Sequence, residues 1–313
     1  MKAAFSHSFG ASIFSLIIQE DALALLLPIL GFLCGWGLAL TPFSSHLKGL
    51  LSKLLAQLFI PIVIIYNMVF YQSGSLSLMV FSFSVAVLMF YLFQFIFKDQ
   101  LRALCMSYVN LAWLGFPFAL ALFGPEVSAA MVALYIGGSV FGNIWAITAV
   151  SSTPQPVSTV IKKVVLSPPV CALFIALICR IWGVQHLQQH QWIDVIYSVA
   201  KVGMSFTGMC VLGMWLQQTQ VCLADLRRSS QVFFMKIAFG GVICSFTYWF
   251  IPIENIEKYI GVMFLLFCLP PAANIVALET HYQGTGKSAQ YIASGTIVSC
   301  IVVTLYGVML HLV

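Results

Sequence analysis

Ten apolar segments, each about as long as a membrane-spanning helix, dominate this chain of 313 residues. A spanning helix needs about 20 predominantly apolar residues. Only 7% of the residues are charged, whereas a soluble domain carries about 25%. The sequence therefore predicts an all-α polytopic membrane protein with no sizeable soluble domain. The expected spans fall near residues 23–41, 50–71, 77–97, 103–123, 127–150, 164–183, 193–216, 230–251, 259–279 and 288–311.

Positive charges are distributed unevenly among the connections between these spans. Nine Lys and Arg residues follow odd-numbered spans, three lie on the opposite side, and two fall within spans. Because cytoplasmic loops carry the excess of Lys and Arg, we expect the odd-numbered connections to be cytoplasmic and both termini to be outside. The three sets are Lys48, Lys53, Lys98, Arg102, Lys162, Lys163, Arg227, Arg228 and Lys287; Lys2, Arg180 and Lys258; and Lys201 and Lys236.

The ten segments divide into two halves of five. Because five is an odd number, a second copy of a five-span unit must insert upside down relative to the first. The halves share spacings, since Gly124 follows Asn110 by fourteen positions and Gly284 follows Pro270 by the same offset. We therefore expect a 5+5 inverted repeat. Its parts are a leader at 1–22, a first repeat at 23–151, a cytoplasmic linker at 152–163 and a second repeat at 164–313.

Two short stretches interrupt apolar segments at matching places in the two halves. Proline removes a backbone donor and clashes with the preceding turn, so we expect the fourth and ninth spans to break there. A matched pair of broken helices is a strong indication of a solute-binding site near the middle of the bilayer. The two stretches read Asn110-Leu-Ala-Trp-Leu-Gly115-Phe-Pro117 and Pro270-Pro271-Ala-Ala-Asn274.

If both spans break near the same depth, we expect them to cross. The N-terminal ends of the resulting half-helices carry partial positive charge and attract anions. The Asn110 and Asn274 carboxamides can donate and accept hydrogen bonds without titrating. This combination predicts a site for a small solute with a carboxylate and some apolar bulk. In the alternative reading, the two Asn side chains only satisfy the broken backbone.

Three further polar residues within the spans are candidates for function. Asn143 lies in a Gly-rich part of the fifth span, where it would contact solute or form an interhelical hydrogen bond. Lys201 lies near the outer end of the seventh span, where it would balance an anionic solute or extend to the interface. Glu279 closes the ninth span at its cytoplasmic end, where it would carry a proton or cation or, as we expect, be a solvated carboxylate at the interface.

Several classes of function lack the residues that they need. The chain has no P-loop, no HExxH and no GxSxG motif, so neither an enzyme nor an ATP-driven pump is predicted. His186 and His190 lack a clear third ligand, so we expect no metal and no cofactor. The scattered basic residues argue against nucleic-acid binding. Most of the nine Cys residues lie in apolar runs and are expected to be buried thiols.

These motifs together resemble the auxin efflux carrier family. The first stretch, followed by Leu122-Phe-Gly124, is similar to the family's fourth span. The second stretch, followed by Tyr282 and by Thr296 and Ser299, is similar to its ninth and tenth spans. The compact linker resembles that of bacterial members rather than that of plant PIN-type carriers. Departures occur at Glu279-Thr-His-Tyr and at Thr304-Leu-Tyr306, which affects the expected coupling and gating but not the fold.

The resemblance implies a homodimeric secondary transporter in the bacterial inner membrane. It would move a small organic anion such as malate, malonate or an auxin-like acid. Its fold would resemble that of bile-acid sodium symporters, with crossing spans four and nine and one helix bundle moving like an elevator. The family's site residues correspond to Asn110, Asn274, Pro117 and Pro270 or Pro271. Two alternatives stay open: a sodium- or proton-coupled symporter of the bile-acid type, and a membrane sensor that binds its ligand without transport.

Overall fold

The structure, a computed structural model, describes residues 29–70, 75–150, 157–184, 191–276, 279, 283 and 287–312. Apart from one isolated β-bridge, the regular structure in these ranges is helical. The α- and π-helical elements are Ile29–Leu38, α2 (Ser44–Leu54), π-helix η1 (Leu55–Phe59), α3 (Ile60–Val69), α4 (Ser75–Phe97), α5 (Gln100–Ser107), π-helix η2 (Leu111–Gly115), α6 (Phe116–Phe123), α7 (Ser128–Val150), α8 (Val157–Val165), α9 (Pro168–Ile181), α10 (Gln191–Gln218), α11 (Leu223–Phe250), α12 (Ile256–Cys268) and α14 (Ser288–Leu312).

The helices have the length and surface of a membrane protein. Within the described ranges, six helices are long and apolar enough to span a bilayer, and three shorter apolar helices accompany them. Large apolar side chains such as Phe95 (83% exposed), Trp182 (80%) and Trp249 (77%) lie on the surface, as expected of side chains that face lipid or another subunit. The prediction of an all-α, multi-pass membrane protein is confirmed at this level. The ten spans and their 5+5 inverted repeat stay a prediction.

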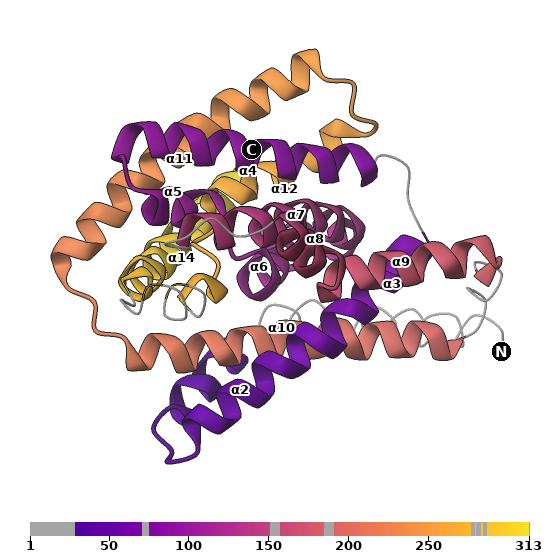
Figure 1. Ribbon diagram of the computed structural model, residues 1–313, viewed down its shortest axis with the longest axis horizontal. Coiled ribbons are helices and arrows are strands. Elements are labelled where there is room, and N and C mark those ends of the chain that lie inside the picture. Colours follow the sequence, from indigo (N-terminus) through magenta and orange to yellow (C-terminus); the bar gives the residue numbers. More distant parts are fainter. Residues whose placement is uncertain are drawn as a thin grey trace, which may run out of the picture.

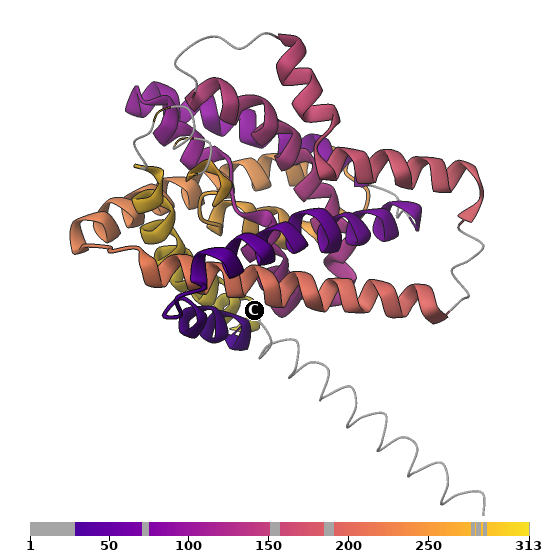
Figure 2. The same cartoon turned by 60° about the horizontal axis from the view of Figure 1, so that its bottom comes forward.

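The described helices pack in two groups that do not coincide with the two halves of the sequence. The first group contains α2, η1, α3, α9 and α10, and the second contains α4, α5, η2, α6, α7, α11, α12 and α14. Figure 1 shows α10 and α2 crossing along one side of the molecule, with α4 and α11 on the other. In Figure 2 the indigo rod of α2 and α3 runs alongside α10. Each group combines helices from both halves, so the halves interlock.

Glycine allows the closest approach between neighbouring helices. A Cβ atom on Gly137 of α7 would lie 2.2 Å from the carbonyl oxygen of Met79 on α4. A Cβ atom on Gly35 would lie 1.8 Å from the carbonyl oxygen of Cys210 on α10. Because small residues let helix backbones approach in membranes, these positions fix α7 against α4 and the helix Ile29–Leu38 against α10.

The structure describes part of the predicted linker and none of the predicted leader. Residues 1–22 and the first part of the linker, 152–156, lie outside the described residues. The remainder of the linker is helical, because Val157–Val165 forms α8. Ser167 then has an extended conformation, and Pro168 and Pro169 occupy the first turn of α9. Proline suits a first helical turn, where its missing N–H leaves no hydrogen bond unmade.

Candidate functional site

The two broken spans cross, and their extended segments pair with each other. α5 ends at Ser107 and α12 ends at Cys268. Val109 and Pro271 then form an antiparallel bridge. The backbone N–H of Asn110 donates to the Pro270 carbonyl at 2.8 Å, and the N–H of Ala272 donates to the Tyr108 carbonyl at 2.8 Å. The segments at which we expect the fourth and ninth spans to break therefore lie side by side, as the expected crossing requires.

Pro270 and Pro271 are compatible with this pairing because neither occupies a position whose backbone N–H would donate to the facing segment. Both hydrogen bonds of the bridge are made by neighbours of Val109 and Pro271, so the missing N–H of Pro271 is not needed. Pro270 contributes only its carbonyl oxygen. The two prolines thus end α12 without leaving an unmade hydrogen bond in the crossing strands.

The break in the fourth span lies earlier than the proline predicts. The chain is extended at Tyr108 and Val109, and Asn110 is the N-cap of η2, which continues into α6. Pro117 lies inside the first turn of α6, directly after the π-helical turn that ends at Gly115. The expectation that Pro117 breaks the span was wrong. The wider π-helical turn precedes the proline, and the helix continues through it.

Gly115 lies where α6 approaches the end of α12. A Cβ atom there would lie 3.0 Å from Cδ1 of Leu269 and 3.2 Å from Cε of Met131. Its backbone N–H donates to the Asn110 carbonyl at 3.0 Å. Gly115 therefore lets the two crossing spans pack closely, although it does not line the cavity described below.

Asn110 combines a capping role with an unused hydrogen-bond donor. Its side chain is 4% exposed, and its Oδ1 accepts a hydrogen bond from the backbone N–H of Trp113 at 3.1 Å. Its Nδ2 is buried and has no hydrogen-bond partner among the described residues. A buried polar group without a partner costs about 1–3 kcal/mol. The oxygen therefore satisfies the broken backbone, and the nitrogen is a donor without a partner among the described residues. Contact of Asn110 with a solute stays a prediction.

Asn274 lies on the other crossing span, close to the same point. Its Nδ2 donates to the hydroxyl oxygen of Tyr108 at 3.0 Å, while the side chain as a whole is exposed. The Tyr108 ring also contacts α7, since a Cβ atom on Gly142 would lie 2.2 Å from its Cζ. Tyr108 was not a sequence-based candidate. It lies two residues before Asn110, and its residue type is neither a carboxamide nor a proline, so the patterns that mark the two stretches do not include it.

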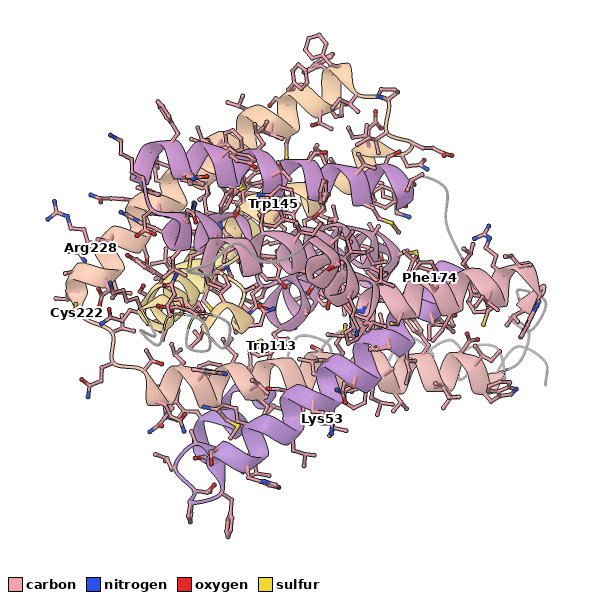
Figure 3. All side chains as sticks on the ribbon, viewed as in Figure 1. Lys53, Trp113, Trp145, Phe174, Cys222 and Arg228 are labelled. Carbon is pink, nitrogen blue, oxygen red and sulfur yellow. The ribbon has the colours of Figure 1, made fainter. Side chains whose placement is uncertain are left out.

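A cavity of about 140 Å³ lies beside the crossing and contains both carboxamides in its wall. It is bounded by the first helix group through η1 and α3, and by the second through the crossing segments, η2 and α7. Figure 3 shows Trp113 between α10 and the interior of the molecule. The wall is formed by Ala56, Ile60, Tyr108, Val109, Asn110, Leu111, Ala112, Trp113, Tyr135, Gly138, Ser139, Ala272, Ala273 and Asn274.

The other two candidates lie away from this cavity. Asn143 is half-buried on α7, one turn beyond Ser139, and is not part of the cavity wall. Lys201 lies on α10 with its Nζ 5.5 Å from the centre of the Tyr197 ring. Tyr197 in turn stacks on Tyr66 at 3.9 Å. The structure therefore does not bring Asn143 or Lys201 together with Asn110 and Asn274.

Lys236 is the charged residue that lies at the break, and it was not a sequence-based candidate. It is 1% exposed, and its Nζ donates to the Leu269 carbonyl at 2.7 Å and lies 4.9 Å from the centre of the Phe233 ring. The preceding carbonyl, on Cys268, accepts from the Ser299 hydroxyl at 2.6 Å. The C-terminal end of a helix carries partial negative charge, which the ammonium of Lys236 offsets at the end of α12.

We expect Lys236→Met to lower the free energy of unfolding by about 1–3 kcal/mol, because the buried Leu269 carbonyl loses its donor. Thermal unfolding of the purified protein in detergent would measure the change. Lys258→Met is the matched control, since Lys258 is exposed in the first turn of α12. Equal unfolding temperatures for the two variants would show that the Lys236 bond contributes nothing to stability.

We expect Gly142→Ala to impair the site through Tyr108, because the added methyl would overlap the ring that carries the acceptor for Asn274. The side chain must then move, so solute binding should weaken by about tenfold, equivalent to one hydrogen bond. Gly241→Ala is the control, because no atom lies within 4 Å of a Cβ atom there. Unchanged binding in Gly142→Ala would exclude Tyr108 from the positioning of Asn274.

Glu279 is not the solvated carboxylate that the sequence suggested. It is 0% exposed and accepts hydrogen bonds from the backbone N–H groups of Lys287 and Ser288 at 2.7 Å each. The Ser288 hydroxyl donates to the same carboxylate. Ser288 begins α14, so Glu279 satisfies donors at the N-terminus of that helix. The interpretation was wrong because the backbone N–H groups at the start of α14 lie against the Glu279 carboxylate and bury it.

Neither a metal site nor a family match is found for this protein among the described residues and the sequences compared. No group of three or more His, Cys, Asp or Glu residues in the described part of the chain could hold a metal ion, and His186 and His190 lie outside that part. A scan against protein-family models finds no match, and no curated protein matches the sequence. The resemblance to the auxin efflux carrier family therefore stays a prediction from the motifs.

Proposed function

We propose that this protein is a secondary transporter that moves a small organic anion across the membrane by alternating access. The observation that carries the proposal is the buried, unpartnered Nδ2 of Asn110, a residue that lines the crossover cavity. The cavity provides apolar surface from Ile60, Leu111 and Trp113 and donors from carboxamide and hydroxyl groups. A carboxylate with apolar bulk matches both parts of this wall.

The position of the cavity supports a transport cycle of the elevator type. Its wall combines η1 and α3 of the first helix group with the crossing segments of the second group. A relative movement of the two groups would change which side of the membrane the cavity faces. Such rigid-body movement of one bundle against another around a fixed site is the usual basis of alternating access. A homodimer in a bacterial inner membrane belongs to the same proposal through the family resemblance.

Coupling to sodium has less support than uncoupled transport. Helix C-terminal ends and unwound carbonyls coordinate Na⁺ in related transporter architectures. Here the Leu269 carbonyl at the end of α12 already binds the ammonium of Lys236. Glu279 is bound to the N-terminus of α14. We therefore propose that the anion moves without a coupling cation.

The test is transport in proteoliposomes. Solid-supported-membrane currents would be recorded for malate, malonate, lactate and indole acetate, with and without a sodium or pH gradient, and radiolabelled exchange would detect electroneutral transport. A saturable, sodium-independent signal for one acid is expected. A signal that requires sodium or a proton gradient would favour the coupled symporter. Binding without any flux would favour the sensor and overturn the transport proposal.

A further inference from the structure

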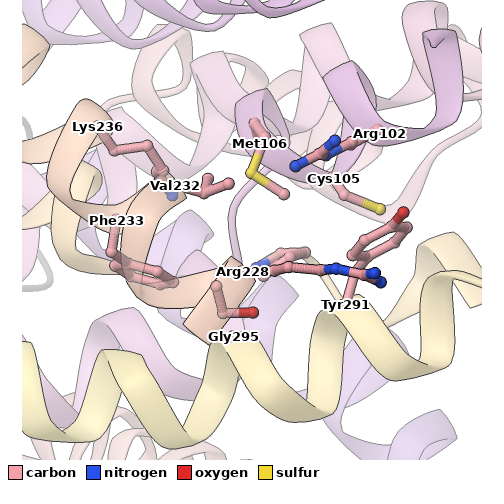
Figure 4. Close-up of a pocket in the computed structure, with 11 residues that line it drawn as sticks. Arg102, Cys105, Met106, Arg228, Val232, Phe233, Lys236, Tyr291 and Gly295 are labelled. Carbon is pink, nitrogen blue, oxygen red and sulfur yellow. The ribbon is translucent and has the colours of Figure 1, made fainter. Parts of the chain in front are cut away.

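A second set of cavities lies on the opposite side of the crossing segment 269–273. Pro271 lines a small inner pocket together with residues of α5, α11 and α14, whereas Ala272 and Ala273 line the crossover cavity. Figure 4 shows Arg228 reaching toward Tyr291 at one end of the inner pocket, Lys236 at the other end, and the guanidinium of Arg102 pointing toward Met106. Neighbouring residues of this segment therefore line different cavities, Pro271 the inner pocket and Ala272 and Ala273 the crossover cavity.

The inner pocket adjoins a larger outer pocket. The two share Arg228 and Tyr291 in their walls, and the outer pocket has a volume of about 230 Å³. The outer wall consists of polar side chains: Asp225, Arg228, Lys287, Gln290, Tyr291 and Ser294. Its size suits a small anion, and the inner pocket, at about 10 Å³, has room for about one water molecule.

The charges around the two pockets are strongly unequal. Four basic side chains and one carboxylate line them, and the Glu279 carboxylate lies next to them, at the backbone N–H groups of Lys287 and Ser288. The lining carboxylate, Asp225, accepts from the backbone N–H and the thiol of Cys222, at 3.2 and 2.9 Å, in a capping box at the start of α11. A concentration of like charge in a recess raises the local concentration of counter-ions. The four cations are Arg102, Arg228, Lys236 and Lys287.

One of these cations has a donor that nothing in the described protein uses. The Nε atom of Arg102 is buried and has no hydrogen-bond partner among the described residues. The guanidinium lies 3.7 Å from the centre of the Phe97 ring, which holds it in position. Arg102 lines the inner pocket and not the outer one, so it contributes positive charge beside the larger recess rather than a direct contact there.

We propose that these pockets form a second anion-binding site, which takes a small carboxylate or phosphate group between Arg228, Lys287 and Tyr291. The positive-inside prediction puts Arg102, Arg228 and Lys287 on the cytoplasmic side, so the site opens there. Its charge supplies the binding energy, because charge-assisted hydrogen bonds from guanidinium and ammonium groups are the strong ones. If the protein is a transporter, this site would hold the anion before it reaches the crossover cavity, and that role rests on the proposed function. The binding of an anion at this site does not depend on the proposed function.

The same chemistry has two sources, a free anion and the phosphate of a lipid headgroup. Equilibrium dialysis of radiolabelled malonate, with orthophosphate as competitor, would be done on the protein in nanodiscs of phosphatidylcholine and again in nanodiscs of phosphatidylglycerol. We expect two malonate ions per chain in phosphatidylcholine. Loss of one of these ions in phosphatidylglycerol, with that lipid retained through purification, would identify the headgroup as the occupant.

Arg228→Gln and Arg227→Gln form a matched pair for this measurement. Arg227 is exposed and lines neither pocket. We expect Arg228→Gln to weaken the second site by about tenfold or more, the effect of one charge-assisted hydrogen bond, and Arg227→Gln to leave it unchanged. Asn110→Ala should remove only the other malonate ion. Retention of the second ion in Arg228→Gln identifies a failure of this proposal, whereas retention of the first in Asn110→Ala identifies a failure of the crossover site.

Two further outcomes would overturn the second site. One is equal binding and equal lipid retention in Arg228→Gln and Arg227→Gln. The other has three parts: the unmodified protein binds a single malonate ion per chain, Asn110→Ala removes that ion completely, and the unmodified protein retains no phosphatidylglycerol. Size-exclusion profiles and unfolding temperatures of the two Arg variants would show that both are folded, because both side chains are exposed at the start of α11.

Discussion

Asn110→Ala is expected to weaken binding of the organic anion by about 100-fold and so to remove saturable transport. The substitution deletes the unpartnered Nδ2 donor of a residue that lines the cavity. A hydrogen bond to a charged group contributes about 1.5–3 kcal/mol, which corresponds to about 10- to 150-fold in affinity. The same substitution deletes the cap on the Trp113 N–H, which costs about 1 kcal/mol of stability.

Radiolabelled binding to the purified protein and flux in proteoliposomes would measure the two effects separately. Asn143→Ala is the control, since Asn143 is also a carboxamide in a span but lies outside the cavity wall. The Asn143→Ala protein should bind the organic anion as tightly as the unmodified protein does. Normal transport by Asn110→Ala would show that the crossover cavity is not the binding site, even if the protein proves to be a transporter.

Glu279→Ala should produce the largest loss of stability, about 3 kcal/mol in the free energy of unfolding, since each unpaired donor in a buried position costs about 1–3 kcal/mol. The substitution leaves the backbone N–H groups of Lys287 and Ser288 without their carboxylate acceptor. It also removes a negative charge from the N-terminal end of α14, where the helix dipole favours one.

Unfolding temperature in detergent would be compared among Glu279→Ala, Glu279→Gln and Glu257→Ala. Glu257 is exposed in the first turn of α12, so its removal should change the free energy by less than about 0.5 kcal/mol. Glu279→Gln keeps one acceptor oxygen and should be intermediate. A Glu279→Ala protein as stable as the Glu257→Ala protein would contradict the capping role.

The position of the crossing could be predicted from residue types, because Asn and Pro are costly inside an apolar helix and together indicate a break in it. What could not be predicted was the register. Whether Val109 pairs with Pro271 or with a neighbour depends on the packing of α5 against α14 and of α12 against α7, which a local pattern does not contain. The same limit accounts for the misplaced break at Pro117, since the π-helical turn before it depends on contacts with α10.

Charged residues in the spans were harder to assign than the carboxamides. Lys201 and Lys236 look alike in sequence, as single cations inside apolar windows. Their difference is tertiary, because Lys236 meets a carbonyl that lies 33 positions away on another helix, whereas Lys201 lies over a tyrosine on its own helix. A span that contains Lys indicates a buried partner, but it does not indicate which element supplies that partner.

The antiparallel bridge between Val109 and Pro271 has a consequence for biosynthesis. The chain passes through the ribosome in order, so the first crossing strand is made long before the second. Until then, the N–H of Asn110 and the carbonyl of Tyr108 lack the partners that they have in the finished protein. An unpaired backbone group in hydrocarbon costs several kcal/mol, so this strand is expected to stay with water or with the insertion machinery until its partner arrives. A chain truncated before Pro270 would keep that strand unpaired and would present it to the proteases that survey the membrane.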